Sequence, residues 1–94
     1  SNPMSLPEDE NKETFKIAPN PVSNGVVRIT LPESWSNVNQ ADIAVTLYDG
    51  SGKIVLNTQF NENLEIPSGL HGLFFLKLNN KANGRVLSAK ILVI

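Results

Sequence analysis

The chain of 94 residues contains no cysteine, a single histidine and no long apolar run. Without cysteine there is no disulfide framework, no thiolate metal ligand and no thiol nucleophile, so cysteine usage does not indicate a compartment. The longest apolar runs, 73–76 and 91–94, are far shorter than the about 20 residues of a membrane-spanning helix. The sequence also does not begin with a basic region followed by an apolar segment, so no signal peptide is expected in it, and the protein is either cytoplasmic or part of a longer chain.

The sequence also has almost no excess of one sign of charge over the other. The 8 basic and 9 acidic side chains give a net charge of −1, and the basic residues are scattered along the sequence. A nucleic-acid partner requires a basic field that neutralises phosphates, so no nucleic acid is expected. A chain of this length forms one domain with a modest core, which leaves little material for an elaborate catalytic cleft.

Two regions differ in composition. Residues 1–13 are rich in Pro, Asn, Asp and Glu and are predicted to be a flexible leader or linker. From residue 14 onward, short stretches of alternating apolar and polar residues are separated by Gly, Asn, Pro and Ser, and helical spacing is absent. Residues 14–94 are therefore predicted to form an all-β domain, an immunoglobulin-like antiparallel β-sandwich of about seven strands. The expected strands are 14–18, 26–31, 43–48, 54–60, 64–66, 72–78 and 85–94.

The alternation also predicts which side chains face the core. In the hairpin around Asp49-Gly50-Ser51-Gly52, we expect Ile54, Leu56, Thr58 and Phe60 to share one face. The segment 33–41, which carries Trp35, is predicted to be a loop with at most one helical turn. The other expected inward residues are Phe15, Ile17, Val27, Ile29, Leu31, Ile43, Val45, Leu47, Phe74, Leu76, Leu78, Leu87, Ala89, Ile91 and Val93.

The candidates for chemistry are weak. His71 is the only imidazole, and base catalysis needs an orienting partner; a small hydrolase would require Ser68 or Ser88 and a carboxylate beside it. Asp49-Gly50-Ser51-Gly52 has too few alternating oxygen ligands for a calcium loop, and a hairpin turn explains it better. The acidic cluster Glu8-Asp9-Glu10 is interpreted as a solvated spacer. No catalytic residue, metal site or cofactor is predicted.

Two apolar features leave alternatives open. Leu73 and Phe75 should point away from the core, where they form either a binding patch or a surface covered by loops. The segment 91–94 is apolar on both faces, which is unusual for an exposed edge strand. It is either a central strand or a strand that another protein receives.

Four short motifs, taken in their order, resemble the C-terminal sorting domain of the type IX secretion system of Bacteroidetes. They are Pro-Asn-Pro at 19–21, Tyr48-Asp49 followed by Gly52-Lys53, the strand 72–78 that begins with Gly, and the Lys-led strand 90–94 at the end of the sequence. The resemblance covers residues 15–94. It departs from the family pattern at Ala18, where an aromatic residue is common, and at Phe74, where Tyr is usual.

The resemblance implies a sorting signal without catalysis of its own. Such domains direct a cargo protein, attached in front of them, through an outer-membrane translocon, and a sortase-like peptidase commonly removes them. The cargo passes through the periplasm and ends at the cell surface or outside the cell. The implied translocon-recognition residues are Lys90, Ile91, Leu92, Val93 and Ile94, together with Gly52, Lys53 and Gly72. The implied cleavage region is Pro7, Glu8, Asp9, Glu10, Asn11, Lys12 and Glu13.

Further alternatives stay open on the residues themselves. Gly52 and Gly72 lie where turns need them, so backbone shape explains each of them better than recognition does. Two copies could form a dimer by pairing through the terminal strand. The competing function is an accessory module that binds carbohydrate or protein at the bacterial surface, which Trp35, Tyr48 and Phe75 exposed on one surface would favour.

Overall fold

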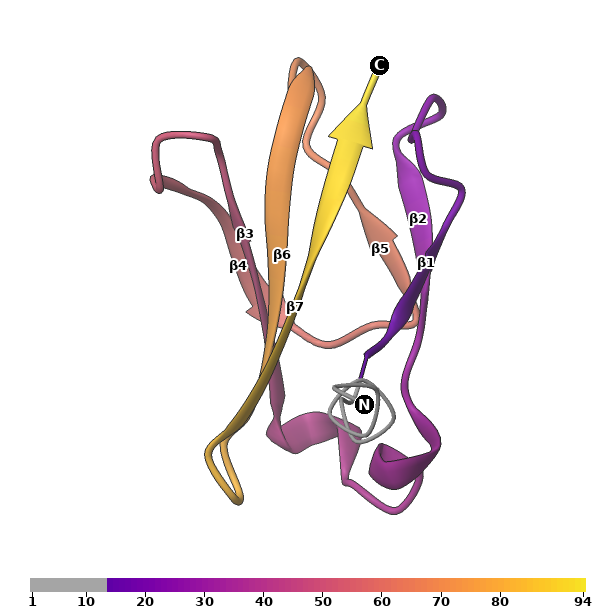
Figure 1. Cartoon of the computed structure of the whole chain (residues 1–94), viewed down its shortest axis with the longest axis vertical. Helices are drawn as coiled ribbons and strands as arrows, with labels where there is room; N and C mark the ends of the chain where they lie inside the picture. Colours follow the sequence, from indigo (N-terminus) through magenta and orange to yellow (C-terminus); the bar gives the residue numbers. More distant parts are fainter. Residues whose placement is uncertain (1–13) are drawn as a thin grey trace, which may run out of the picture.

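The computed structural model describes residues 14–94, which form two antiparallel sheets packed face to face (Figure 1). The leader predicted over residues 1–13 lies outside the described residues. The first sheet has the order β1-β2-β5 and the second the order β4-β3-β6-β7. The strands are β1 (Lys16–Ala18), β2 (Val26–Thr30), β3 (Ile43–Tyr48), β4 (Ile54–Gln59), β5 (Asn63–Glu65), β6 (Gly72–Asn80) and β7 (Arg85–Val93).

This strand order confirms the predicted all-β, immunoglobulin-like sandwich, in which the fourth strand pairs with the third and so joins the second sheet. Two single 3₁₀ turns, η1 (Glu33–Trp35) and η2 (Gln40–Asp42), lie in the connection between β2 and β3, where at most one helical turn was expected. Within residues 14–94, no helix has the length and apolar character needed to cross a membrane.

The core lies between the two sheets and follows the predicted period of two. In β3, β6 and β7, alternate side chains are buried against the facing sheet, as the sequence predicts. The element η1 lies at the end of the sandwich opposite the chain's last residue (Figure 1), and its Trp35 is only 1% exposed. The buried core residues are Phe15, Val22, Val27, Ile29, Trp35, Ile43, Val45, Leu47, Phe60, Leu64, Ile66, Phe74, Leu76, Leu78, Leu87, Ile91 and Val93.

Two residues predicted to lie in the core, Ile54 and Thr58, are exposed. Thr58 lies opposite the buried Val45 on the edge strand β4, whereas Ile54 is on the opposite face from the one predicted. Ile54 was expected to share the core face with Leu56, but it is 51% exposed and pairs with Tyr48 on the outer face. The cause is a register shift between Leu47 and Tyr48, where the β3 to β4 ladder passes from Leu47 opposite Leu56 to Tyr48 opposite Ile54. An irregularity of this kind places two residues of one strand opposite one of its partner and reverses the face on which the residues beyond it lie.

The interpretation of the terminal strand as a central strand is also wrong. Strand β7 is the edge of the four-stranded sheet, with β6 as its neighbour on one side. On the other side, Val22 from the β1 to β2 connection forms an isolated parallel bridge to Val93. This bridge links the two sheets along one side of the sandwich, and Val22 is fully buried there.

Candidate functional site

The residues that the sequence motifs single out meet at one end of the sandwich. Strands β6 and β7 pair Gly72 with Val93, and strands β3 and β6 pair Tyr48 with Phe75. The β3 to β4 hairpin, the start of β6 and the end of β7 therefore lie together, at the end where the last residue is marked in Figure 1. We call this region the terminal-strand end.

The last residues of the chain alternate strictly between core and surface. Ile91 and Val93 are buried, whereas Lys90, Leu92 and Ile94 are exposed. This alternation explains why the segment is apolar on both faces: one set of side chains packs in the core, and the other lies on the outer face of the sheet. Of the five predicted recognition residues in this segment, three can contact a partner without unfolding the domain.

The backbone of this segment is held on both sides. The backbone N–H of Val22 donates to the carbonyl of Leu92 at 2.7 Å, and the backbone N–H of Ile94 donates to the carbonyl of Val22 at 2.9 Å. Asn20 continues this contact with its side chain, which donates through Nδ2 to the carbonyl of Lys90 at 3.3 Å. Its Oδ1 accepts from the backbone N–H of Leu92 at 3.1 Å.

The sequence predicted only a turn at Pro19-Asn20-Pro21 and missed this contact with the terminal strand. Neither proline has a backbone N–H, so the segment offers few main-chain donors for pairing. An amide side chain carries both a donor and an acceptor, as a peptide group does. The signal in the sequence is the Asn between two prolines. Its side-chain amide can make the strand hydrogen bonds that a backbone peptide group would otherwise make.

Asp49 organises the β3 to β4 hairpin, which lies at the terminal-strand end but is separated from β7 by β6. Its Oδ1 accepts from the backbone N–H of Ser51 at 2.9 Å, from the Ser51 hydroxyl at 2.7 Å and from the backbone N–H of Lys53 at 2.9 Å. The hydrogen bonds from the Ser51 side chain and the Lys53 backbone lower the pKa of Asp49, because they favour the charged carboxylate. Gly52 has a φ of +90°, a left-handed conformation that suits glycine. The hairpin-turn interpretation of this motif is confirmed.

The other candidates for chemistry do not assemble into a site. His71 is exposed in the connection between β5 and β6. Residues 14–94 contain no group of three or more His, Cys, Asp or Glu side chains that could hold a metal ion. Tyr48 and Phe75 are neighbours on the outer face of the four-stranded sheet, but the buried Trp35 does not join them. The condition that would have favoured a carbohydrate-binding surface is therefore not met.

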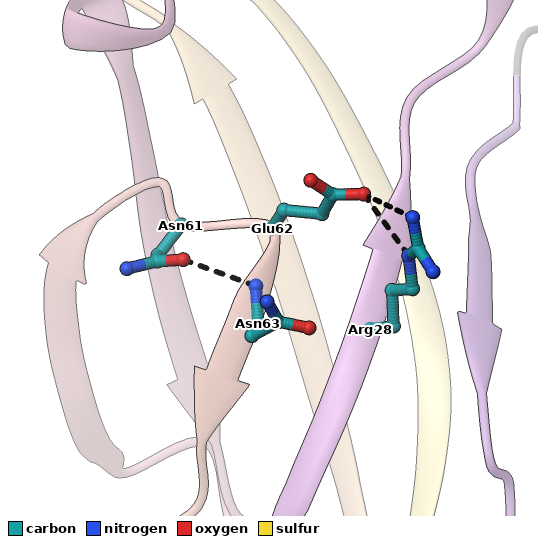
Figure 2. Close-up of polar contacts among 4 residues, drawn as sticks. All are labelled: Arg28, Asn61, Glu62 and Asn63. Atoms are coloured by element: carbon teal, nitrogen blue, oxygen red, sulfur yellow. Dashed lines mark hydrogen bonds and ion pairs between the residues drawn. The ribbon is translucent and has the colours of Figure 1, made fainter.

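A groove of about 430 Å³ lies between β4 and β5, away from the terminal-strand end. Beside it, Figure 2 shows the connection between these strands, where Glu62 Oε2 accepts from Arg28 Nε at 3.0 Å and from Arg28 Nη2 at 2.7 Å. In the same connection, Asn61 Oδ1 accepts from the backbone N–H of Asn63 at 3.0 Å. The ion pair is exposed, so it contributes at most about 1 kcal/mol. These contacts lie where the chain crosses from one sheet to the other.

Fold and surface together define a small β-sandwich module in which the residues of the sequence motifs gather at one end. The sequence model of the secretion-system C-terminal sorting domain matches residues 16–94, nearly the whole described part. The chain therefore belongs to this family, whose members are sorting signals for type IX secretion rather than catalysts. Membership implies interaction with the type IX machinery, attachment to a larger cargo protein, and export to the cell surface or beyond. Neither the comparison with curated proteins nor that with solved structures gave a match.

Proposed function

We propose that the type IX translocon recognises this domain in its folded state, through the outward side chains of the terminal strand. The observation that carries the proposal is the alternation at the end of the chain. Lys90, Leu92 and Ile94 are exposed on one face, while Ile91 and Val93 hold the strand in the core. A receptor can thus contact a cation and two apolar side chains at fixed spacing without the entropic cost of ordering the strand.

Recognition through side chains is favoured over addition of a receptor strand along the same segment. Strand addition needs unpaired N–H and C=O groups. At Leu92 both groups already bond to the β1 to β2 connection, and the N–H of Ile94 does so as well. In this proposal Ile91 and Val93 act through packing, and the exposed Lys53 of the β3 to β4 hairpin, at the same end of the sandwich, adds a second cation. Gly52 and Gly72, with φ values of +90° and +105°, shape the backbone.

The proposal includes removal of the domain by a sortase-like peptidase that cuts within residues 7–13. This stretch consists of one Pro, one Asn, one Lys and four acidic residues, and it contributes no large apolar side chain to a core. Phe15 is the first buried residue of the described chain. A cut before residue 14 would therefore separate the cargo from an intact sandwich, and exposed polar segments at domain boundaries are the usual sites of proteolysis.

In this proposal, the parent protein crosses the periplasm with the sandwich folded and leaves it behind at the outer membrane. Pairing of two copies through β7 stays a prediction. The last residues of β7 are already bonded to Asn20 and Val22. A second copy would have to pair with the earlier part of the strand.

The test is a reporter placed behind an export signal and in front of residues 1–94, expressed in a type IX-competent host. The variant K90E/L92S/I94S changes only exposed side chains, and V86S changes an exposed apolar residue at the other end of the same strand. We expect the triple variant to stay in the periplasm and V86S to be exported like the unmodified domain. Mass spectrometry of the released reporter should find its new end within residues 7–13. Export of the triple variant at the unmodified level would refute recognition through this strand.

A further inference from the structure

The outer face of the four-stranded sheet carries an apolar cluster beyond the terminal strand. Of the six large hydrophobic residues that are exposed in the described chain, four belong to the strands β4, β6 and β7 or directly follow β7, and lie at the terminal-strand end: Ile54, Leu73, Leu92 and Ile94. The strand register places Ile54, Tyr48, Phe75 and Lys90 in one row across the sheet, and pairs Leu73 with Leu92 in the next row. We call Ile54, Tyr48, Leu73, Phe75 and Leu92 the outer patch. With strands about 4.8 Å apart, the row spans about 15 Å.

The strands that carry this patch have charged side chains of one sign only. Strands β3, β4, β6 and β7 contain no Asp or Glu, although the chain as a whole has nine acidic residues. Lys90 ends the row at one edge of the sheet. Lys77 lies outside the row, and its Nζ is 6.0 Å from the centroid of the Tyr48 ring. The nearest acidic residue along the chain, Asp49, has its Oδ1 committed to Ser51 and Lys53. An apolar centre with a cationic rim is thus built on a nearly neutral domain.

We propose that the outer patch is a docking surface for a folded protein that presents an apolar centre flanked by carboxylates. This inference rests on the proposed function, since it assigns the partner to the type IX machinery. It extends the contact from the terminal strand to β3, β4 and β6. The residues it adds are Ile54, Tyr48, Leu73, Phe75 and Lys77. All of them except Ile54 lie within the sequence motifs, but the resemblance implies none of them as a recognition residue.

Charge complementarity favours a protein over a lipid surface. Binding to an anionic membrane typically needs a cluster of about 4–8 basic residues, whereas the four strands of this sheet contain three, Lys77, Arg85 and Lys90. Aromatic side chains at the centre of a patch with charges at its rim are typical of protein interfaces. Because Lys77 lies near the ring of Tyr48, a partner carboxylate that pairs with it would also cover the aromatic centre.

The test uses the export fusion of residues 1–94 with substitutions outside the terminal strand. The double variant I54S/L73S removes two exposed apolar side chains, and K77E reverses the charge beside Tyr48. The matched controls are V86S, since Val86 is 48% exposed and Leu73 47%, and K81E in the β6 to β7 turn. Circular dichroism melting of each purified domain checks that the variants fold. Loss of contacts of this kind is expected to lower binding, and hence the exported fraction, about tenfold.

Each outcome separates the two proposals. Reduced export of I54S/L73S and K77E, with both controls unaffected, supports the docking surface. Normal export of all variants overturns the docking surface and leaves the proposed function standing. Failure of the unmodified fusion to be exported overturns both. The purified domain is also mixed with phosphatidylcholine vesicles containing phosphatidylglycerol. Binding that salt and K77E abolish, together with normal export of K77E, would assign the patch to lipid and overturn the protein partner.

Discussion

Replacing Asn20 by Ala should loosen the terminal strand without unfolding the sandwich. The substitution removes the 3.1 Å bond from the Leu92 N–H and the 3.3 Å bond to the Lys90 carbonyl. A net hydrogen bond contributes about 0.5–1.5 kcal/mol. Both bonds are exposed, so water replaces them and no buried group is left unpaired. The bond to the Lys90 carbonyl is long, so the two bonds together are expected to stabilise the attachment of the terminal strand by about 1–2 kcal/mol.

Native-state hydrogen exchange measures this effect at single residues. A loss of about 1.4 kcal/mol corresponds to a tenfold change, so the amide of Leu92 should exchange about tenfold faster in N20A. The amide of Ile91, on the β6 side of the strand, should change much less. The control N24A removes an Asn from the same connection whose Oδ1 accepts only from the Val26 N–H, at 3.4 Å. Equal exchange of Leu92 in the unmodified domain and in N20A would refute the role given to Asn20.

Three further predictions concern stability. Deleting residues 90–94 removes the fully buried Ile91, a loss of about 2–5 kcal/mol for that side chain alone, and should unfold much of the domain; a melting curve like that of the full domain would contradict this. The pKa of Asp49 in the folded domain is lowered below its ordinary value of 3.8. The charged carboxylate therefore contributes its full share of the folding stability above pH 3.8, and this share is lost as the pH falls through the pKa of the folded state. The stability difference between the unmodified domain and D49N should therefore shrink only below about pH 4 in chemical denaturation, and a constant difference down to pH 2 would count against the carboxylate contacts. G52A places an L side chain at φ +90° and should lower the free energy of unfolding by about 1–2 kcal/mol. The control G50A changes a glycine without positive φ and should lower it less. Equal losses of unfolding free energy in denaturant titrations would argue against the assigned turn.

Much of the fold can be predicted from the sequence because burial imposes a period of two on every strand. The inward faces of β2, β3, β6 and β7 agree with the prediction for this reason. Ile54 does not, because a register shift depends on how two strands pair and leaves no mark in the alternation of either one. The short turns around Trp35 were likewise only partly foreseen, since single 3₁₀ turns lack a periodic signal.

The site was predictable in its parts but not in its assembly. The motifs around Gly52, Gly72 and Lys90 could be recognised in the sequence, yet their meeting at one end depends on the order of strands in the sheet, which local patterns do not specify. The contact of Asn20 with Leu92 joins residues 72 positions apart. The outer patch depends in addition on the displaced Ile54. Long-range pairing therefore decides which side chains a partner can meet.

The central claim, that the sandwich is itself the export signal, is tested most directly by comparing one fusion in two strains. A reporter carrying residues 1–94 behind an export signal is expressed in a type IX-competent host and in its translocon-deficient derivative. We expect the reporter to appear outside the first strain and to stay in the periplasm of the second. Equal distribution of the reporter in both strains, with a folded domain, would contradict the claim.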